Sequence, residues 1–204
     1  MLVKIGQALD HGFDAPLGLL SDCHRRIEHF LKVLVTVADV RRGAALLPAD
    51  RAIMEAALHY FRTAAPRHSA DEEQSLFPRL RQSREPEALA ALQRLDALEA
   101  DHRVAEDHHD AVDLLARRWL QAGTLGPGDA RSLREHLVAL ERLYRRHIAV
   151  EDQELFPAAG RVLSAHDIEA VGREMAARRN LSPMTGVTPM TGAAPGTGGV
   201  STGE

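Results

Sequence analysis

The chain has 204 residues, of which 45% are hydrophobic and 26% charged, and 25 basic residues against 29 acidic ones give a net charge of −4. This charge gives no indication of a nucleic-acid partner, and no apolar run approaches the roughly 18 residues that a membrane-spanning helix needs. The one cysteine, Cys23, excludes an internal disulfide and suits a reducing compartment. The N-terminal stretch is interrupted by acidic residues, histidine and glycine, so we expect no signal peptide and a cytoplasmic location.

Alanine, leucine, arginine and glutamate dominate the sequence, and no segment alternates with the period of a strand, so we expect an all-α protein. In chain order, helices are expected at residues 17–42, 50–81, 86–120 and 129–163, followed by a short fifth helix at 165–179. Asp50 is a favourable N-cap, and Pro66 should kink the second helix just before His68.

Length and composition also predict the domain organisation. Residues 1–165 are long enough to bury one core, and residues 166–180 form a short extra helix. Residues 181–204 repeat Pro-Met-Thr-Gly twice and offer little apolar surface, so we expect a disordered tail.

Two tracts, HSADEEQSLFP at residues 68–78 and HIAVEDQELFP at 147–157, share one pattern of chemistry. His68 and Glu72 of the first tract recur 79 residues later as His147 and Glu151. Two earlier tracts, HRRIE at 24–28 and HRVAE at 102–106, are offset by 78 residues. The chain therefore consists of two similar helical hairpins, which predicts an antiparallel four-helix bundle with a pseudo-twofold repeat.

The repeated residues have the chemistry of metal ligands. Residues four apart on a helix share a face, so each His-x-x-x-Glu pair can point two ligands at one place between helices. Buried acids and imidazoles would be costly without a cation, and imidazole with carboxylate suits iron or manganese, with zinc as an alternative. One glutamate from each half could bridge two metal ions, with two histidines for each. The candidate ligands are His24, His68, Glu72, His102, His147 and Glu151.

Several neighbouring residues are less clearly part of such a site. Glu28 and Glu106 could be further ligands, hydrogen-bond acceptors for a ligand imidazole, or exposed acids paired with arginine. Glu73 points about 100° away from Glu72, so we expect it to be solvated. His109 lies on the face of His102 but about 10 Å further along the helix, which disfavours ligation. The arginines at 173–179 are interpreted as a solvated helix end.

The pattern of His24, His68 with Glu72, His102, and His147 with Glu151 resembles the hemerythrin-like family of HHE cation-binding domains. That resemblance implies a four-helix bundle around a non-haem di-iron centre, with two iron ions per chain. Members of the family variously bind dioxygen, sense oxygen, nitric oxide or iron, or handle peroxide. The oxygen carriers have a histidine and an aspartate where this chain has Glu106 and Glu151, which disfavours reversible oxygen carriage.

We therefore expect a di-iron protein whose open coordination position meets dioxygen, nitric oxide or peroxide in sensing or stress response. The alternatives are a di-iron oxidase or peroxidase, a protein that binds or buffers iron, and a bundle that binds zinc adventitiously. The sequence predicts neither nucleic acid nor membrane as a partner, and it leaves the oligomeric state open.

Overall fold

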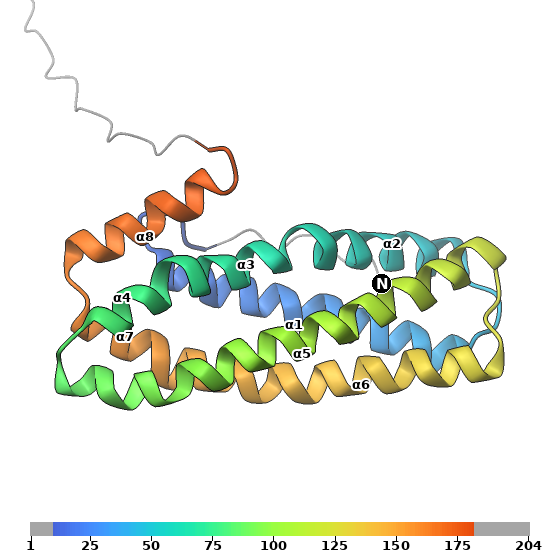
Figure 1. The fold of residues 1–204 in the computed structure, drawn as a ribbon. Coiled ribbons are helices and arrows are strands. Elements are labelled where there is room, and N and C mark those ends of the chain that lie inside the picture. Colours follow the sequence, from blue (N-terminus) through green and yellow to red (C-terminus); the bar gives the residue numbers. More distant parts are fainter. Residues whose placement is uncertain (1–9, 182–204) are drawn as a thin grey trace, which may run out of the picture.

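The computed structural model describes residues 10–181, which form helices joined by short connections and contain no strand. Four long helical segments lie side by side, and an additional short helix packs against one end of them (Figure 1). In chain order the elements are α1 (Pro16–Arg41), α2 (Pro48–Thr63), α3 (Ala65–Asp71), η1 (Glu72–Leu76), α4 (Phe77–Gln82), α5 (Pro86–Ala122), α6 (Pro127–Val150), η2 (Glu151–Leu155), α7 (Phe156–Val162) and α8 (Ala165–Ala177).

The topology is that of an antiparallel four-helix bundle. α1 packs against α2 and α6, and α5 packs against α6 and α2, so each long helix has two neighbours. The connections at 42–47, 83–85 and 123–126 are short and reverse the chain direction, which makes sequential helices antiparallel. The prediction of an all-α helical bundle is confirmed. Among the described residues, no helix combines the length and apolar character needed to cross a membrane.

Prolines divide the second and fourth segments. The helix is interrupted at Ala64, immediately before α3, because Pro66 has no N–H to offer the carbonyl of Arg62. The helix is thus interrupted where the sequence predicted a kink, just before His68.

A second pair of prolines has a less expected effect. Pro78 and Pro157 each follow a π-helical turn, η1 or η2, and the helix then continues beyond the proline. In η1 the N–H of Phe77 reaches back five residues to the carbonyl of Glu72. This wider turn gives room for the proline ring.

The apolar core consists of two clusters of buried side chains. One cluster includes Ile27 and Ala105, and the other includes Leu20 and Leu98. On α1, His24 lies between Leu20 and Ile27, and on α5, His102 lies between Leu98 and Ala105. A polar layer therefore crosses the bundle and separates the two clusters. The layer contains the buried polar residues His24, His68, Glu72, His147 and Glu151.

The C-terminal helix α8 is attached to the bundle beside η1 (Figure 1). Its Val171 and Met175 are fully buried, and ion pairs of 2.8 and 2.7 Å join Arg178 and Arg179 to Asp71, a buried carboxylate. The prediction of a solvated helix end is therefore wrong for Arg178 and Arg179, whereas Arg173 is exposed as expected. The predicted disordered tail, apart from Leu181, lies outside the described residues.

Candidate metal centre

The structure brings six of the predicted ligands together in the polar layer. They fall into two groups, and the candidate ligand atoms of each group lie within 4.8 Å of one another. The groups are His24, His68, Glu72 and Glu151, and Glu72, His102, His147 and Glu151. Each group thus contains the two histidines of one hairpin, and both groups share the same two glutamates.

The helical spacing within each tract brings one histidine close to one glutamate. Nε2 of His68 lies 3.4 Å from Oε1 of Glu72, and Nε2 of His147 lies 3.1 Å from Oε2 of Glu151, both at a spacing of four residues. Each glutamate is the first residue of a π-helical turn, an irregularity that is frequent at functional sites.

Two further contacts cross between the hairpins, whereas Nε2 of His24 also lies 3.9 Å from Oε1 of Glu72 in its own hairpin. Nε2 of His24 lies 3.1 Å from Oε2 of Glu151, and Nε2 of His102 lies 3.3 Å from Oε2 of Glu72. Each of these imidazoles therefore faces a carboxylate that belongs to the other half of the repeat. The centre is formed only when the two hairpins pack together.

The acidic residues that follow the two glutamates in the sequence form hydrogen bonds with the outward-facing Nδ1 atoms of His24 and His102. Nδ1 of His24 lies 3.0 Å from Asp152, and Nδ1 of His102 lies 2.7 Å from Glu73. A carboxylate can only accept here, so Nδ1 donates to it and Nε2 is the nitrogen that faces inward, the orientation that a metal ligand needs. Glu73, which was expected to be solvated, keeps 37% of its side chain exposed, but it also accepts a hydrogen bond from the neighbouring helix, which the sequence did not predict.

Phenylalanines of the Leu-Phe-Pro tracts cover the same two imidazoles. The ring of Phe156 is stacked on His24 with a centroid distance of 5.4 Å, and the ring of Phe77 is parallel to His102 at 6.4 Å. Both phenylalanines are buried. They exclude water from one side of the site, and this pairing also crosses between the hairpins.

Buried atoms in this layer lack hydrogen-bond partners. Both carboxylate oxygens of Glu72 and both of Glu151 are buried without a donor, and so is Nε2 of His24. Polar atoms are rarely buried in this way, because each unsatisfied one costs roughly 1–3 kcal/mol and a charged group costs more. A cation between these atoms would satisfy them all.

Burial and the charges of neighbouring groups also shift the pKa values of the residues in this layer. Burial, together with the nearby charge of Glu151, raises the pKa of Glu72 to about 7. Burial alone would lower the pKa of His24, but the carboxylates of Asp152 and Glu151, which face its two ring nitrogens, raise it to about 10. Burial and the charge of His24 hold the pKa of His68 well below its usual range. In the absence of a cation, protons on the imidazoles thus offset part of the carboxylate charge.

The donor set fits two metal ions. Each group supplies two imidazole nitrogens and access to both carboxylates, and a carboxylate can place one oxygen on each of two ions. Nitrogen and oxygen donors without a thiolate suit iron or manganese, and zinc is also compatible.

The two less certain candidates lie elsewhere. Glu28 and Glu106 are both exposed, and neither belongs to a candidate metal group in the described part of the chain. Asp152 and Glu73, which hold the imidazoles, were not recognised from the sequence as part of the site. Asp152 lies 79 residues after Glu73, so the repeat places an acid at the same position in both tracts, and this could have indicated a shared role.

Comparison with known proteins agrees with this geometry. The family model of the hemerythrin HHE cation binding domain matches residues 15–159, so the chain belongs to that family. An uncharacterized protein of Haemophilus influenzae is 29% identical to this chain over 172 residues, which cover 83% of this chain and 92% of the relative. Family and site together define a metal-binding helical domain.

Proposed function

We propose that the protein is a non-haem di-iron protein that reacts with dioxygen, nitric oxide or peroxide in sensing or stress response. His24 and His68 would hold one iron, His102 and His147 the other, and Glu72 and Glu151 would bridge them. The observation that carries this proposal is the sharing of two fully buried carboxylates, which lack hydrogen-bond donors, by two pairs of histidines.

The surrounding residues prepare the site for a small ligand. Asp152 and Glu73 fix the tautomer and ring orientation of the histidines that cross between hairpins. Phe156 and Phe77 limit the access of water. A bound iron pair would supply electrons for reaction with such a ligand, and the exposed Glu106 would not contribute a carboxylate to it.

The test is the optical spectrum of protein that is loaded anaerobically with ferrous iron and then exposed separately to dioxygen, hydrogen peroxide and nitric oxide. We expect dioxygen or peroxide to produce the near-ultraviolet absorption of an oxo-bridged ferric pair, or nitric oxide to produce the visible bands of an iron nitrosyl. Loaded protein whose spectrum is unchanged by all three reagents would contradict the proposal. The matched control is His102→Ala, which should lose one iron site and this response.

A further inference from the structure

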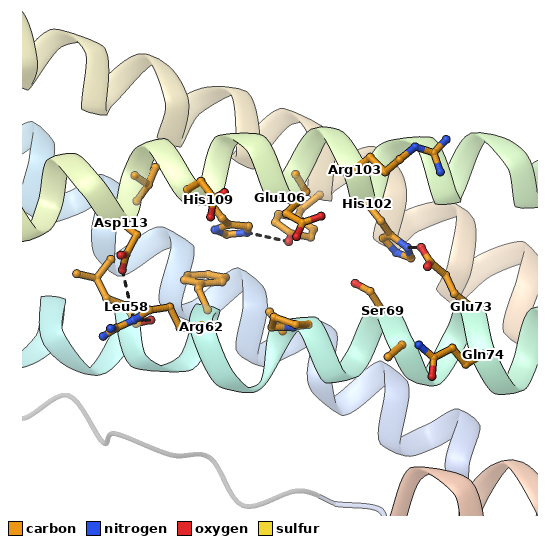
Figure 2. A pocket seen from close by; sticks show the side chains of 18 residues that line it. Leu58, Arg62, Ser69, Glu73, Gln74, His102, Arg103, Glu106, His109 and Asp113 are labelled. Carbon is orange, nitrogen blue, oxygen red and sulfur yellow. Dashed lines mark hydrogen bonds and ion pairs between the residues drawn. The ribbon is translucent and has the colours of Figure 1, made fainter. Parts of the chain in front are cut away.

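A pocket of about 470 Å³ lies between α2, α3 and α5, beside the candidate metal centre. Figure 2 shows Asp113, His109 and His102 following one another along α5, opposite Arg62 and the tract that contains Glu73. Because His102 and Glu73 line this pocket and are also hydrogen-bonded to each other, one end of the pocket adjoins the centre.

The pocket is too large for the diatomic ligands proposed above. A water molecule occupies about 30 Å³ of liquid, and dioxygen, nitric oxide and peroxide each have only two heavy atoms. Sites for small organic molecules, by contrast, have volumes of roughly 300–1,000 Å³. The volume of this pocket thus matches that of sites for small organic molecules.

The floor of the pocket is apolar and uncharged. Leu58, Phe61 and Val112 line it and are buried. The ring of Phe61 stacks on His109 at 4.4 Å, and a hydrogen bond of 2.9 Å joins Nε2 of His109 to the hydroxyl of Tyr144. Burial, reinforced by the charge of His108, lowers the pKa of His109 to about 4, so this imidazole is neutral near pH 7. An apolar or aromatic body would find complementary surface here.

The residues that line the pocket carry an excess of negative charge, with four acids, Glu73, Glu106, Asp110 and Asp113, against the two arginines Arg62 and Arg103. Glu106 and Asp110 lie one helical turn apart on α5, both are exposed, and neither forms an ion pair within residues 10–181. Arg62, the nearest cation on α2, is paired with Asp113 at 3.3 Å, and Arg117 pairs with the same carboxylate at 2.7 Å.

We propose that this pocket binds a small organic cation, an amine with an aromatic or apolar body. The body would lie over the buried floor near Phe61, and the ammonium would face Glu106 and Asp110. Binding does not require the metal. That the bound molecule is a substrate or a signal for the centre rests on the proposed function, because the molecule would lie next to His102.

Three probes with the same indole body and different charge test this inference: tryptamine, tryptophol and indole-3-acetate. Each is titrated into the metal-loaded full-length protein by isothermal titration calorimetry at low salt. We expect tryptamine to bind about tenfold more tightly than indole-3-acetate, with tryptophol between them, and the difference to shrink at high salt. Equal affinities, a preference for the anion, or no binding by tryptamine at millimolar concentration would each overturn the inference.

Two variants and a control locate the binding. Glu106→Gln with Asp110→Asn should remove the preference for the cation, whereas Asp107→Asn with Glu135→Gln removes the same formal charge from exposed positions outside the pocket lining. Ser69→Phe, which fills the pocket, should weaken all bound probes. Tryptamine affinity that both the first pair and Ser69→Phe leave unchanged would place the site elsewhere.

Metal analysis of the same samples separates this inference from the proposed function. If the protein binds tryptamine selectively but holds no iron pair, the pocket assignment is supported and the di-iron proposal is contradicted. If the protein holds two iron ions but shows no preference for the cation, the di-iron proposal is supported and the pocket assignment is contradicted.

Discussion

Nδ1 of His24 lies 3.0 Å from Oδ1 of Asp152, although the two residues are 128 positions apart in the sequence. The corresponding contact in the other half joins His102 to Glu73 at 2.7 Å. In both contacts an imidazole from one hairpin is oriented by a carboxylate from the other. The two hairpins are therefore linked through the outer side of the centre as well as through its interior.

We expect Asp152→Ala and Glu73→Ala each to lower metal affinity by about 10- to 100-fold while the number of ions bound at saturation stays the same. The reason is that the imidazole loses its fixed orientation but keeps its inward-facing nitrogen. Competition with a chelator of known affinity measures the change. Glu154→Ala is the control, because Glu154 is half exposed and pairs with Arg94 away from the centre. Equal effects of all three substitutions would refute an orienting role.

Glu72→Ala and Glu151→Ala should have a different effect, because each removes a carboxylate that both candidate metal groups share. We expect the metal content of these variants to fall to one ion or none. Glu28→Ala and Glu106→Ala should leave the metal content at its normal value, since both side chains are exposed. Metal analysis after saturation distinguishes the two pairs. If Glu106→Ala abolished binding while Glu151→Ala kept both ions, the bridge would be assigned to the wrong residue.

The ion pairs between α8 and the bundle should contribute strongly to stability. Replacing Arg178 and Arg179 together by methionine leaves the fully buried Asp71 carboxylate without its two cations. Loss of the partners of a buried charge typically costs about 3–5 kcal/mol, and we expect a decrease of this size in the free energy of urea unfolding. Arg173→Met is the control, since Arg173 pairs with the exposed Glu169. A double variant as stable as this control would show that the pairs are not stabilising.

His109 should make stability depend on pH. Burial lowers the pKa of His109 from 6.5 to about 4, so between these values the unfolded chain binds a proton that the folded chain does not. The stability from this residue is thus present above about pH 6.5 and is lost as the pH falls toward 4, by about 2 kcal/mol at pH 5 relative to pH 7.

The measurement compares urea unfolding of the protein and of His109→Gln at pH 7 and pH 5. Contributions common to both proteins, including that of metal binding, cancel in the difference. A difference in stability that is the same at both pH values would contradict the neutral, buried state of His109.

Much of the site could be predicted from the sequence because its ligands repeat. The tracts around His68 and His147 contain the same residue types at the same spacing, and a repeat of this kind fixes which faces of the helices meet. The two glutamates with which the π-helical turns begin, Glu72 and Glu151, were recognised for this reason. The turns themselves were not, since a proline in a helical pattern indicates a break more readily than a widened turn.

The residues that the sequence did not reveal depend on contacts between distant segments. Glu73 was expected to be solvated because only its own helix was considered, whereas the bundle places α5 in the direction of its side chain. The ion pairs of Arg178 and Arg179 with Asp71 have no counterpart in the other half, where Val150 takes the position of Asp71. A feature that occurs once, between segments 107 residues apart, leaves no pattern in the sequence.

The metal content of the protein is the most direct test of the dinuclear centre. The protein is loaded anaerobically with excess ferrous iron, separated from unbound metal, and analysed for iron and for protein concentration. The two groups of ligands, which share Glu72 and Glu151, predict two iron ions per chain. A firm value of one iron per chain at saturation would contradict a centre in which both glutamates bridge two ions.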